Sequence, residues 1–175
     1  MSFWRNYYHL VWATKERQPF IQPHIEHRLF DYIEAKAREL EVVLYAINGT
    51  ADHIHLVAAI PPKQSVAAVV QHLKGASSHF VNAHLHPAEF HFAWQDGYGC
   101  LTVGERYKDS AVAYVLAQKE HHAQGSTNGW LERCSLDEEG PTAIAREQHQ
   151  VAEERATYDV SNSRTMTIAA TDPPF

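Results

Sequence analysis

Cysteine is scarce in this sequence of 175 residues, which has two cysteines and no C-x-x-C pair. This scarcity argues against a disulfide framework and against a cysteine zinc site, and it fits a reducing compartment. No apolar run approaches the roughly 18 residues that a membrane-spanning helix needs. The first ten residues also lack a basic segment followed by an apolar stretch. We therefore expect a cytoplasmic protein without a secretory signal and without a membrane partner.

A surplus of basic charge is also missing. Residues 1–130 hold 11 Lys and Arg against 12 Asp and Glu, a net charge of −1, whereas residues 131–175 hold 4 against 9, a net charge of −5. The total charge therefore gives no support for nucleic-acid binding, although a near-neutral domain can still present a local basic groove. Histidine, in contrast, is abundant, and 12 of the 13 histidines precede residue 131.

Hydrophobic periodicity predicts one α+β domain in residues 1–130. Strands are expected at 6–14, 42–48, 53–60 and 93–103, the last one bent or bulged at its glycines. Helices are expected at 25–40, 64–85 and 109–122, with Ser65 as the cap of the second helix. The order β-α-β-β-α-β predicts a ferredoxin-like (RRM-like) antiparallel sheet with helices on one face, followed by a C-terminal helix.

Residues 131–175 are expected to form an acidic C-terminal extension rather than a part of this domain. Turn-like and charged residues dominate there. Glu147–Arg155 is predicted as a short helix, and Tyr158–Phe175 as a mobile, partly disordered tail. The dipeptide Asn48-Gly49, within the domain, is predicted as a turn.

Two histidines in the predicted third strand form the strongest local motif. His53 and His55 are two residues apart, so in a strand they project from the same face with their Cα atoms about 7 Å apart. Two imidazoles from one strand can share a metal ion if a third ligand arrives from elsewhere. The alternative is two half-exposed histidines on an open sheet face, and for an isolated H-x-H this alternative is the more frequent one.

Tyr114 and Gln118 are neighbours on one face of the predicted last helix, because positions four apart lie one turn from each other. A tyrosine oxygen can act as a nucleophile, and an amide oxygen can ligate a metal. Alternatively, Tyr114 anchors the helix and Gln118 is solvated. Together with the histidines the pair is coherent, because phosphodiester transfer needs an in-line nucleophile and a cation on the phosphate oxygens.

Candidate DNA contacts are weaker. Trp94 lies in the glycine-containing stretch 94–99, where an aromatic ring could stack on an unpaired base or fill the core instead. Lys15, Arg17 and Lys74 could contact phosphates, although scattered basic residues usually lie on the surface without a function.

A family resemblance extends over about residues 5–125. The chain resembles the single-tyrosine HUH transposases of small bacterial insertion sequences, including those associated with palindromic repeats. The matching segments are YHLVWATKERQPF, DHIHLVAAIPP, LKGASSHF, WQDGYGCLTVG and YVLAQKEHH, in this order. The two histidines that give the HUH motif its name correspond to His53 and His55. The family's catalytic tyrosine and metal-binding glutamine correspond to Tyr114 and Gln118.

The resemblance implies a mechanism and partners. Tyr114 is expected to attack a scissile phosphate, form a 5′-phosphotyrosine link and release a 3′-hydroxyl, with Mg²⁺ or Mn²⁺ as cofactor. Because nitrogen ligands are unusual for Mg²⁺, we expect a weak site in which Mn²⁺ competes well. The expected substrate is single-stranded DNA with hairpin ends, and the expected assembly is a homodimer.

Two other functions stay open at the level of sequence. One is a domesticated protein that binds hairpin DNA without cleaving it, although binding alone has no need for Tyr114. The other is an unrelated metallohydrolase that uses His53 and His55 with zinc.

Overall fold

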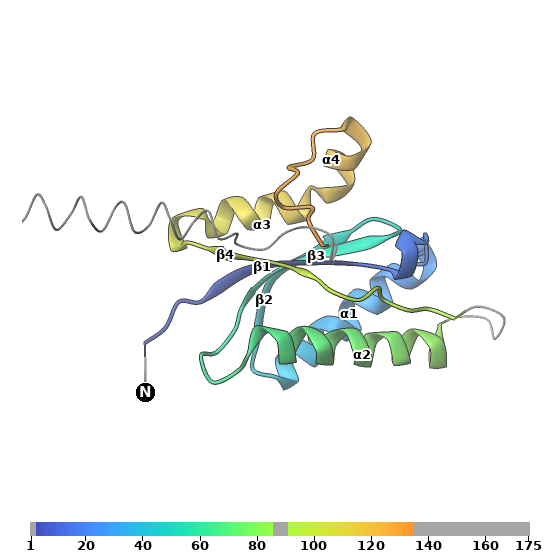
Figure 1. The fold of residues 1–175 in the computed structure, drawn as a ribbon, viewed down its shortest axis with the longest axis horizontal. Coiled ribbons are helices and arrows are strands. Elements are labelled where there is room, and N and C mark those ends of the chain that lie inside the picture. The colour runs from blue at the N-terminus through green and yellow to red at the C-terminus, as the bar shows by residue number, and fades with distance from the viewer. Residues whose placement is uncertain (1–2, 86–90, 135–175) are drawn as a thin grey trace, which may run out of the picture. The chain divides into compact units, whose positions relative to one another are not determined.

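The computed structural model describes residues 3–85 and 91–134, which form four strands and four α-helices (Figure 1). The strands are β1 (Tyr7–Ala13), β2 (Val43–Gly49), β3 (His53–Ala59) and β4 (Gly99–Val103). The helices are α1 (Pro23–Glu39), α2 (Val66–His84), α3 (Lys108–Leu116) and α4 (Gln118–Gln124). Within the described ranges, no helix has the length and apolarity needed to cross a membrane. The helix and tail expected at 147–155 and 158–175 lie outside these ranges.

The sheet has the order β2-β3-β1-β4, and each pair of neighbouring strands is antiparallel. Helices α1 and α2 cover one face of this sheet, and α3 lies on the opposite face (Figure 1). This arrangement confirms the predicted ferredoxin-like, RRM-like fold with an additional C-terminal helix. The additional helix covers the face that the other two leave free.

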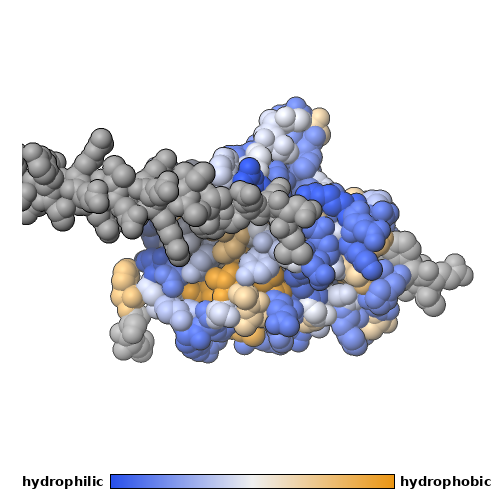
Figure 2. Space-filling view, in the orientation of Figure 1, coloured by the Kyte–Doolittle hydropathy of each residue, from blue (hydrophilic) through white to orange (hydrophobic). Residues whose placement is uncertain are grey.

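The main core lies between the sheet and the pair α1 and α2. Side chains alternate along the central strands, so that Leu10 and Trp12 of β1 and Ile54 and Leu56 of β3 point into this core. Helix α1 adds an apolar stripe at helical spacing, formed by Ile25, Leu29, Ile33 and Ala37. In the view of Figure 2, hydrophilic residues dominate the visible surface, and apolar side chains gather above α2.

The local sequence determines where these two helices begin. Pro23 is the first residue of α1, where its fixed φ suits the helix and its missing N–H is not needed. Helix α2 is capped by Ser65, whose Oγ accepts a hydrogen bond from the Ala68 N–H at 3.1 Å. The predicted cap is therefore confirmed.

The fourth strand is shorter than the predicted strand at 93–103. Residues near Trp94 still follow the end of β1, through the bridge between Thr14 and Trp94, but the chain then leaves the sheet until Gly99. Gly97 has a φ of 78°, which ends the extended conformation. The Lys74 ammonium fixes this detour by donating hydrogen bonds to the carbonyls of Gln95 and Gly97, both at 2.7 Å.

The last helix, predicted to be continuous over 109–122, is broken at Ala117 into α3 and α4. In a continuous helix the Leu116 carbonyl would accept a bond from the N–H four residues later, at Glu120. Here the Asn48 side-chain amide donates to that carbonyl at 2.7 Å, and the Glu120 N–H bonds to the Ala117 carbonyl instead. The chain consequently changes direction, and α4 points away from α3 (Figure 1).

The turn predicted at Asn48-Gly49 lies a little later, because β2 continues through Gly49 and the chain reverses over residues 50–52. Gly49 is paired with Ile54 of β3. A Cβ atom at Gly49 would lie 2.2 Å from the His53 carbonyl oxygen, closer than two such atoms can approach. This position therefore requires glycine because the neighbouring strand is too close for a side chain.

We expect Gly49→Ala to lower the free energy of unfolding by about 1–3 kcal/mol, because the strand that carries His53 must move to admit the methyl group. Gly75→Ala is the matched control. Gly75 lies within α2 and has no atom within 4 Å of its added Cβ, so alanine there should stabilise the protein by about 0.5–1 kcal/mol. Urea unfolding of both variants measures these changes, and the same change in the free energy of unfolding for both would show that the space around Gly49 is not limiting.

Candidate functional site

Three buried histidines gather on the sheet face that α3 covers. His53 and His55 lie on β3 and His9 lies on β1, and all three are at most 2% exposed. Because the strands are antiparallel and His55 is paired with Val11, His9 comes to lie beside His55 across the strand pair. The predicted common face of His53 and His55 is present, and these side chains are buried rather than open to solvent.

His53 is held by its Nδ1 atom. Nδ1 lies 2.7 Å from Asp52 Oδ1 and 2.8 Å from Thr50 Oγ1, and the Thr50 hydroxyl also donates to Asp52 Oδ1 at 2.7 Å. The Arg17 guanidinium donates to the other carboxylate oxygen at 3.3 Å. These contacts direct Nε2 of His53 into the site, an arrangement that orients histidine ligands in metal proteins.

His55 is held in a similar manner, by another histidine. Its Nδ1 atom shares a hydrogen bond with His9 Nε2 at 3.0 Å, and the two rings stack with centroids 5.1 Å apart. Burial, followed by the nearby His55, lowers the pKa of His9 to about 4. His9 is therefore a neutral partner at ordinary pH. His9 was not among the residues predicted for the site, although its position in the predicted first strand was a usable indication.

Tyr114 and Gln118 reach the same place from the opposite side. Tyr114, on α3, has its ring centroid 6.4 Å from that of His55, and its hydroxyl accepts a hydrogen bond from the Asn128 N–H at 3.0 Å. Burial is the main cause that raises the pKa of Tyr114. Gln118, the first residue of α4, is fully buried. The two side chains converge although the helix breaks between them.

A carboxylate that the sequence did not predict lies at the centre of the site. Glu132 Oε1 accepts a hydrogen bond from the Tyr114 hydroxyl at 2.6 Å, while Oε2 lies 3.2 Å from Nε2 of both His53 and His55. His122 Nε2 is 3.4 Å from the same oxygen. Glu132 falls within the stretch assigned to the acidic extension, and nothing in its local pattern distinguishes it from the other acidic residues there.

These groups fit a divalent cation. Ligand atoms of His53, His55, His122 and Glu132 all lie within 4.8 Å of one another. A further observation supports the fit, because Oε1 of Gln118 is buried without a hydrogen-bond partner among the described residues. A buried polar atom without a partner is costly, and a metal ion is one way to satisfy it.

The electrostatics of the site follow from this crowding. Burial on its own favours neutral Glu132, but the contacts with His53 and His55 outweigh it and hold the pKa of this carboxyl well below its usual value. Burial likewise lowers the pKa of His53, and the carboxylates of Asp52 and Glu132 more than compensate, so the net shift is upward. For His55 burial prevails, and its pKa is lowered. The site therefore concentrates negative charge beside imidazoles.

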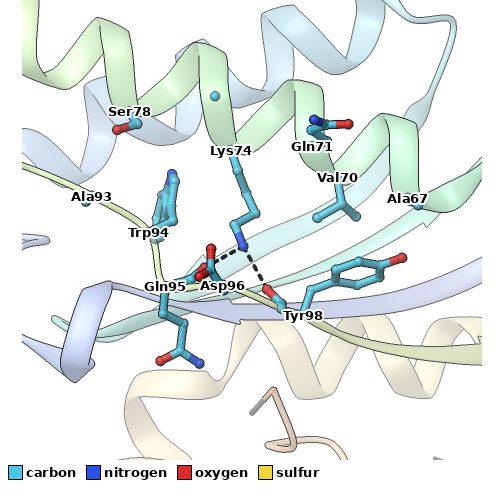
Figure 3. A pocket seen from close by; sticks show the side chains of 12 residues that line it. Ala67, Val70, Gln71, Lys74, Ser78, Ala93, Trp94, Gln95, Asp96 and Tyr98 are labelled. Carbon is cyan, nitrogen blue, oxygen red and sulfur yellow. Dashed lines mark hydrogen bonds between the residues drawn. The ribbon is translucent and has the colours of Figure 1, made fainter. Parts of the chain in front are cut away.

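The residues expected to contact DNA are placed differently. Arg17 forms an ion pair with Asp52, which in turn contacts His53. Lys15 is exposed and lies in the same short 3-10 helix as Arg17, Lys15–Arg17. Trp94 and Lys74 instead line a pocket of about 360 Å³ between α2 and residues 93–98 (Figure 3). This pocket lies on the side of the sheet that α1 and α2 cover, opposite to the face under α3 that carries Tyr114.

Both side chains in this pocket have structural contacts. The Trp94 ring packs edge-on against Trp12 and Phe92, and its Nε1–H donates to Ser77 Oγ at 3.0 Å. Burial lowers the pKa of Lys74, whose ammonium holds two backbone carbonyls (Figure 3). Much of Trp94 therefore belongs to the core under α2.

Comparisons with known proteins agree with this geometry. Residues 2–118 match the family described as "Transposase IS200 like". The transposases for insertion sequence element IS200 of Salmonella typhimurium and Salmonella typhi are each 29% identical over 128 residues, which cover 70% of this chain and 82% of theirs.

Two solved structures are similar in fold. One, from Deinococcus radiodurans and described as a transposase, has a TM-score of 0.54 and 26% identity, covering 67% of this chain and 95% of its own. The other is a REP-associated tyrosine transposase bound to a REP hairpin, with a TM-score of 0.53, 14% identity and coverage of 74% and 76%. The family match spans two thirds of the sequence and includes His53, His55, Tyr114 and Gln118. The chain therefore belongs to the IS200-like transposase family.

Proposed function

We propose that this transposase binds single-stranded DNA with hairpin ends and cleaves and rejoins it through a 5′-phosphotyrosine intermediate at Tyr114. One observation carries the proposal: the Tyr114 hydroxyl and the Nε2 atoms of His53 and His55 meet within one chain, at the two oxygens of a single carboxylate. A nucleophile and metal ligands this close together can act on one phosphate group. This convergence also supports a site formed in cis.

The roles follow from the chemistry of each group. His53, His55 and Gln118 would hold Mg²⁺ or Mn²⁺, and when bound the cation supplies positive charge that neutralises the phosphate oxygens. The Tyr114 oxygen attacks phosphorus, the bond to the 3′-oxygen breaks, and the phenolic proton is balanced by the proton gained at the released 3′-hydroxyl. Rejoining reverses this step with another 3′-hydroxyl, so the phosphotyrosine ester conserves the bond energy and no nucleotide cofactor is needed.

The surrounding residues keep these groups in position. Asp52 fixes the ring of His53, and His9 fixes the ring of His55. The Asn128 N–H, bonded to the Tyr114 oxygen, orients the nucleophile and stabilises negative charge as the phenol loses its proton. Preorganisation of this kind reduces the reorganisation that the reaction requires.

DNA is the proposed partner, and a homodimer the proposed assembly. The REP-hairpin complex of the structural neighbour supports a hairpin substrate for this fold. Lys15 and Arg17 lie near the histidine cluster and are suited to phosphate contacts. Lys74 and the exposed part of Trp94 would contact DNA only at a second place, the pocket beside α2.

Tyr114→Phe is expected to abolish the covalent protein–DNA adduct and to lower cleavage by at least about three orders of magnitude, because phenylalanine lacks the attacking oxygen. Hairpin binding should be largely unchanged. Denaturing gels that detect protein linked to labelled single-stranded DNA measure the adduct, and mobility shifts measure binding. An adduct that persists in this variant rules out Tyr114 as the nucleophile; tight binding without cleavage by the wild type, at any metal concentration, favours a domesticated binding protein.

Chelation of divalent ions should stop cleavage, and Mn²⁺ should restore it at lower concentration than Mg²⁺, because imidazole nitrogen ligands suit Mn²⁺ better. His53→Ala should weaken Mn²⁺ binding by at least about tenfold, since even residues that only orient a ligand have effects of this size. His24→Ala, an exposed histidine on α1, is the control. Isothermal titration with Mn²⁺ measures both, and equal affinities for the two variants would refute the ligand assignment.

A further inference from the structure

Residues 128–134, which we call the 128–134 segment, bring Glu132 to the site although they follow the family match, which ends at residue 118. A turn begins the segment, where the Leu131 N–H bonds to the Asn128 carbonyl at 2.9 Å. The Asn128 N–H in turn donates to Tyr114. The segment is therefore tied to the nucleophile at its first residue.

The other end of the segment is packed against the sheet. Cys134 is 2% exposed and forms a small apolar cluster with Val11 and Ala13. The Gln95 side-chain amide donates to the Cys134 carbonyl at 3.2 Å. At Gly99 the segment comes so close that an added Cβ would lie 1.9 Å from the Arg133 carbonyl oxygen. These contacts, on both sides of Glu132, pack the segment against the domain as part of its structure.

The spacing of atoms around Glu132 is compatible with a shared metal ion as well as with direct hydrogen bonds. Mn²⁺ and Mg²⁺ ligands lie about 2.0–2.2 Å from the ion, so adjacent ligand atoms at right angles are about 3 Å apart. Oε2 of Glu132 is 3.2 Å from Nε2 of His53 and 3.2 Å from Nε2 of His55. Both imidazoles are held through Nδ1, which leaves Nε2 of each ring facing Glu132.

We propose that Glu132 is a carboxylate ligand of the divalent ion and, through its second oxygen, the group that positions the Tyr114 hydroxyl. The proposal rests on the proposed function for the identity of the nucleophile. Two histidines and one carboxylate are a ligand set typical of Mn²⁺ and Fe²⁺ rather than Mg²⁺, and the carboxylate supplies the hard, charged oxygen that two imidazoles and an amide lack. His122, 3.4 Å from the same oxygen, completes the cluster at its exposed side.

If Glu132 instead excludes DNA from the site, its replacement should make cleavage faster rather than slower. Its carboxylate also bridges the nucleophile and the imidazoles as a scissile phosphate would, so it could exclude DNA from the site. The anchoring of the segment at Asn128, Gly99 and Cys134 favours the ligand role, because a removable plug would have to break all of these contacts at every turnover.

The test compares Glu132→Gln with Glu34→Gln, which removes the same charge from an exposed position on α1. Isothermal titration of the DNA-free protein with Mn²⁺ should show at least about a tenfold loss of affinity for Glu132→Gln and no change for Glu34→Gln. Cleavage of hairpin DNA should fall only in the former. Glu132→Asp keeps the charge but shortens the reach, so its affinity should be intermediate.

Circular dichroism and thermal unfolding establish whether each variant is folded. If Glu132→Gln does not fold, the Mn²⁺ affinity of Glu132→Asp is compared with that of the wild type instead. Unchanged Mn²⁺ affinity in a folded Glu132 variant overturns the proposal, and faster cleavage with unchanged affinity shows that Glu132 is a plug. Tyr114→Phe separates the ligand role of Glu132 from the nucleophile role of Tyr114. It should keep Mn²⁺ affinity, so loss of metal binding in Glu132→Gln supports the ligand role even if Tyr114 is not the nucleophile.

Discussion

Strands β1 and β3 pair antiparallel along their whole length, with His55 opposite Val11 and His9 opposite Val57. Because side chains alternate, this register places the histidines on one face of the sheet and residues such as Leu10 and Leu56 in the core on the other. A slip by one residue would bury the imidazoles under α1 and α2 and expose the core. The hydrophobic core therefore fixes the register that keeps the three histidine rings together on one face.

Burial of so many polar side chains is costly unless each has a partner, and neighbouring side chains supply several of these partners. Asp52 and His9 contact the Nδ1 atoms of His53 and His55, and both Nε2 atoms face Glu132. The break at Ala117 serves the same end, because it allows the fully buried Gln118 to approach the cluster from α4. At this break the Asn48 side-chain amide donates a hydrogen bond to the Leu116 carbonyl.

The sequence predicted some residues as DNA contacts that the fold also uses structurally. Lys74 holds the carbonyls of the detour before β4, and the Trp94 ring is packed on Phe92. Composition cannot separate these uses, because a basic or aromatic residue near glycines has the same local pattern whether it faces a phosphate or a carbonyl. Only the position of α2 beside residues 93–98 shows where the Lys74 ammonium lies.

The sequence by itself determined the order of strands and helices, the Ser65 cap and the common face of His53 and His55, because alternation and helical spacing are properties of the local chain. Tertiary structure alone decided that His9 supports His55, that the last helix breaks at Ala117, and that Glu132 lies between Tyr114 and the imidazoles. Each of these features joins segments far apart in the sequence, and strand register or packing, which no local pattern encodes, brings them into contact.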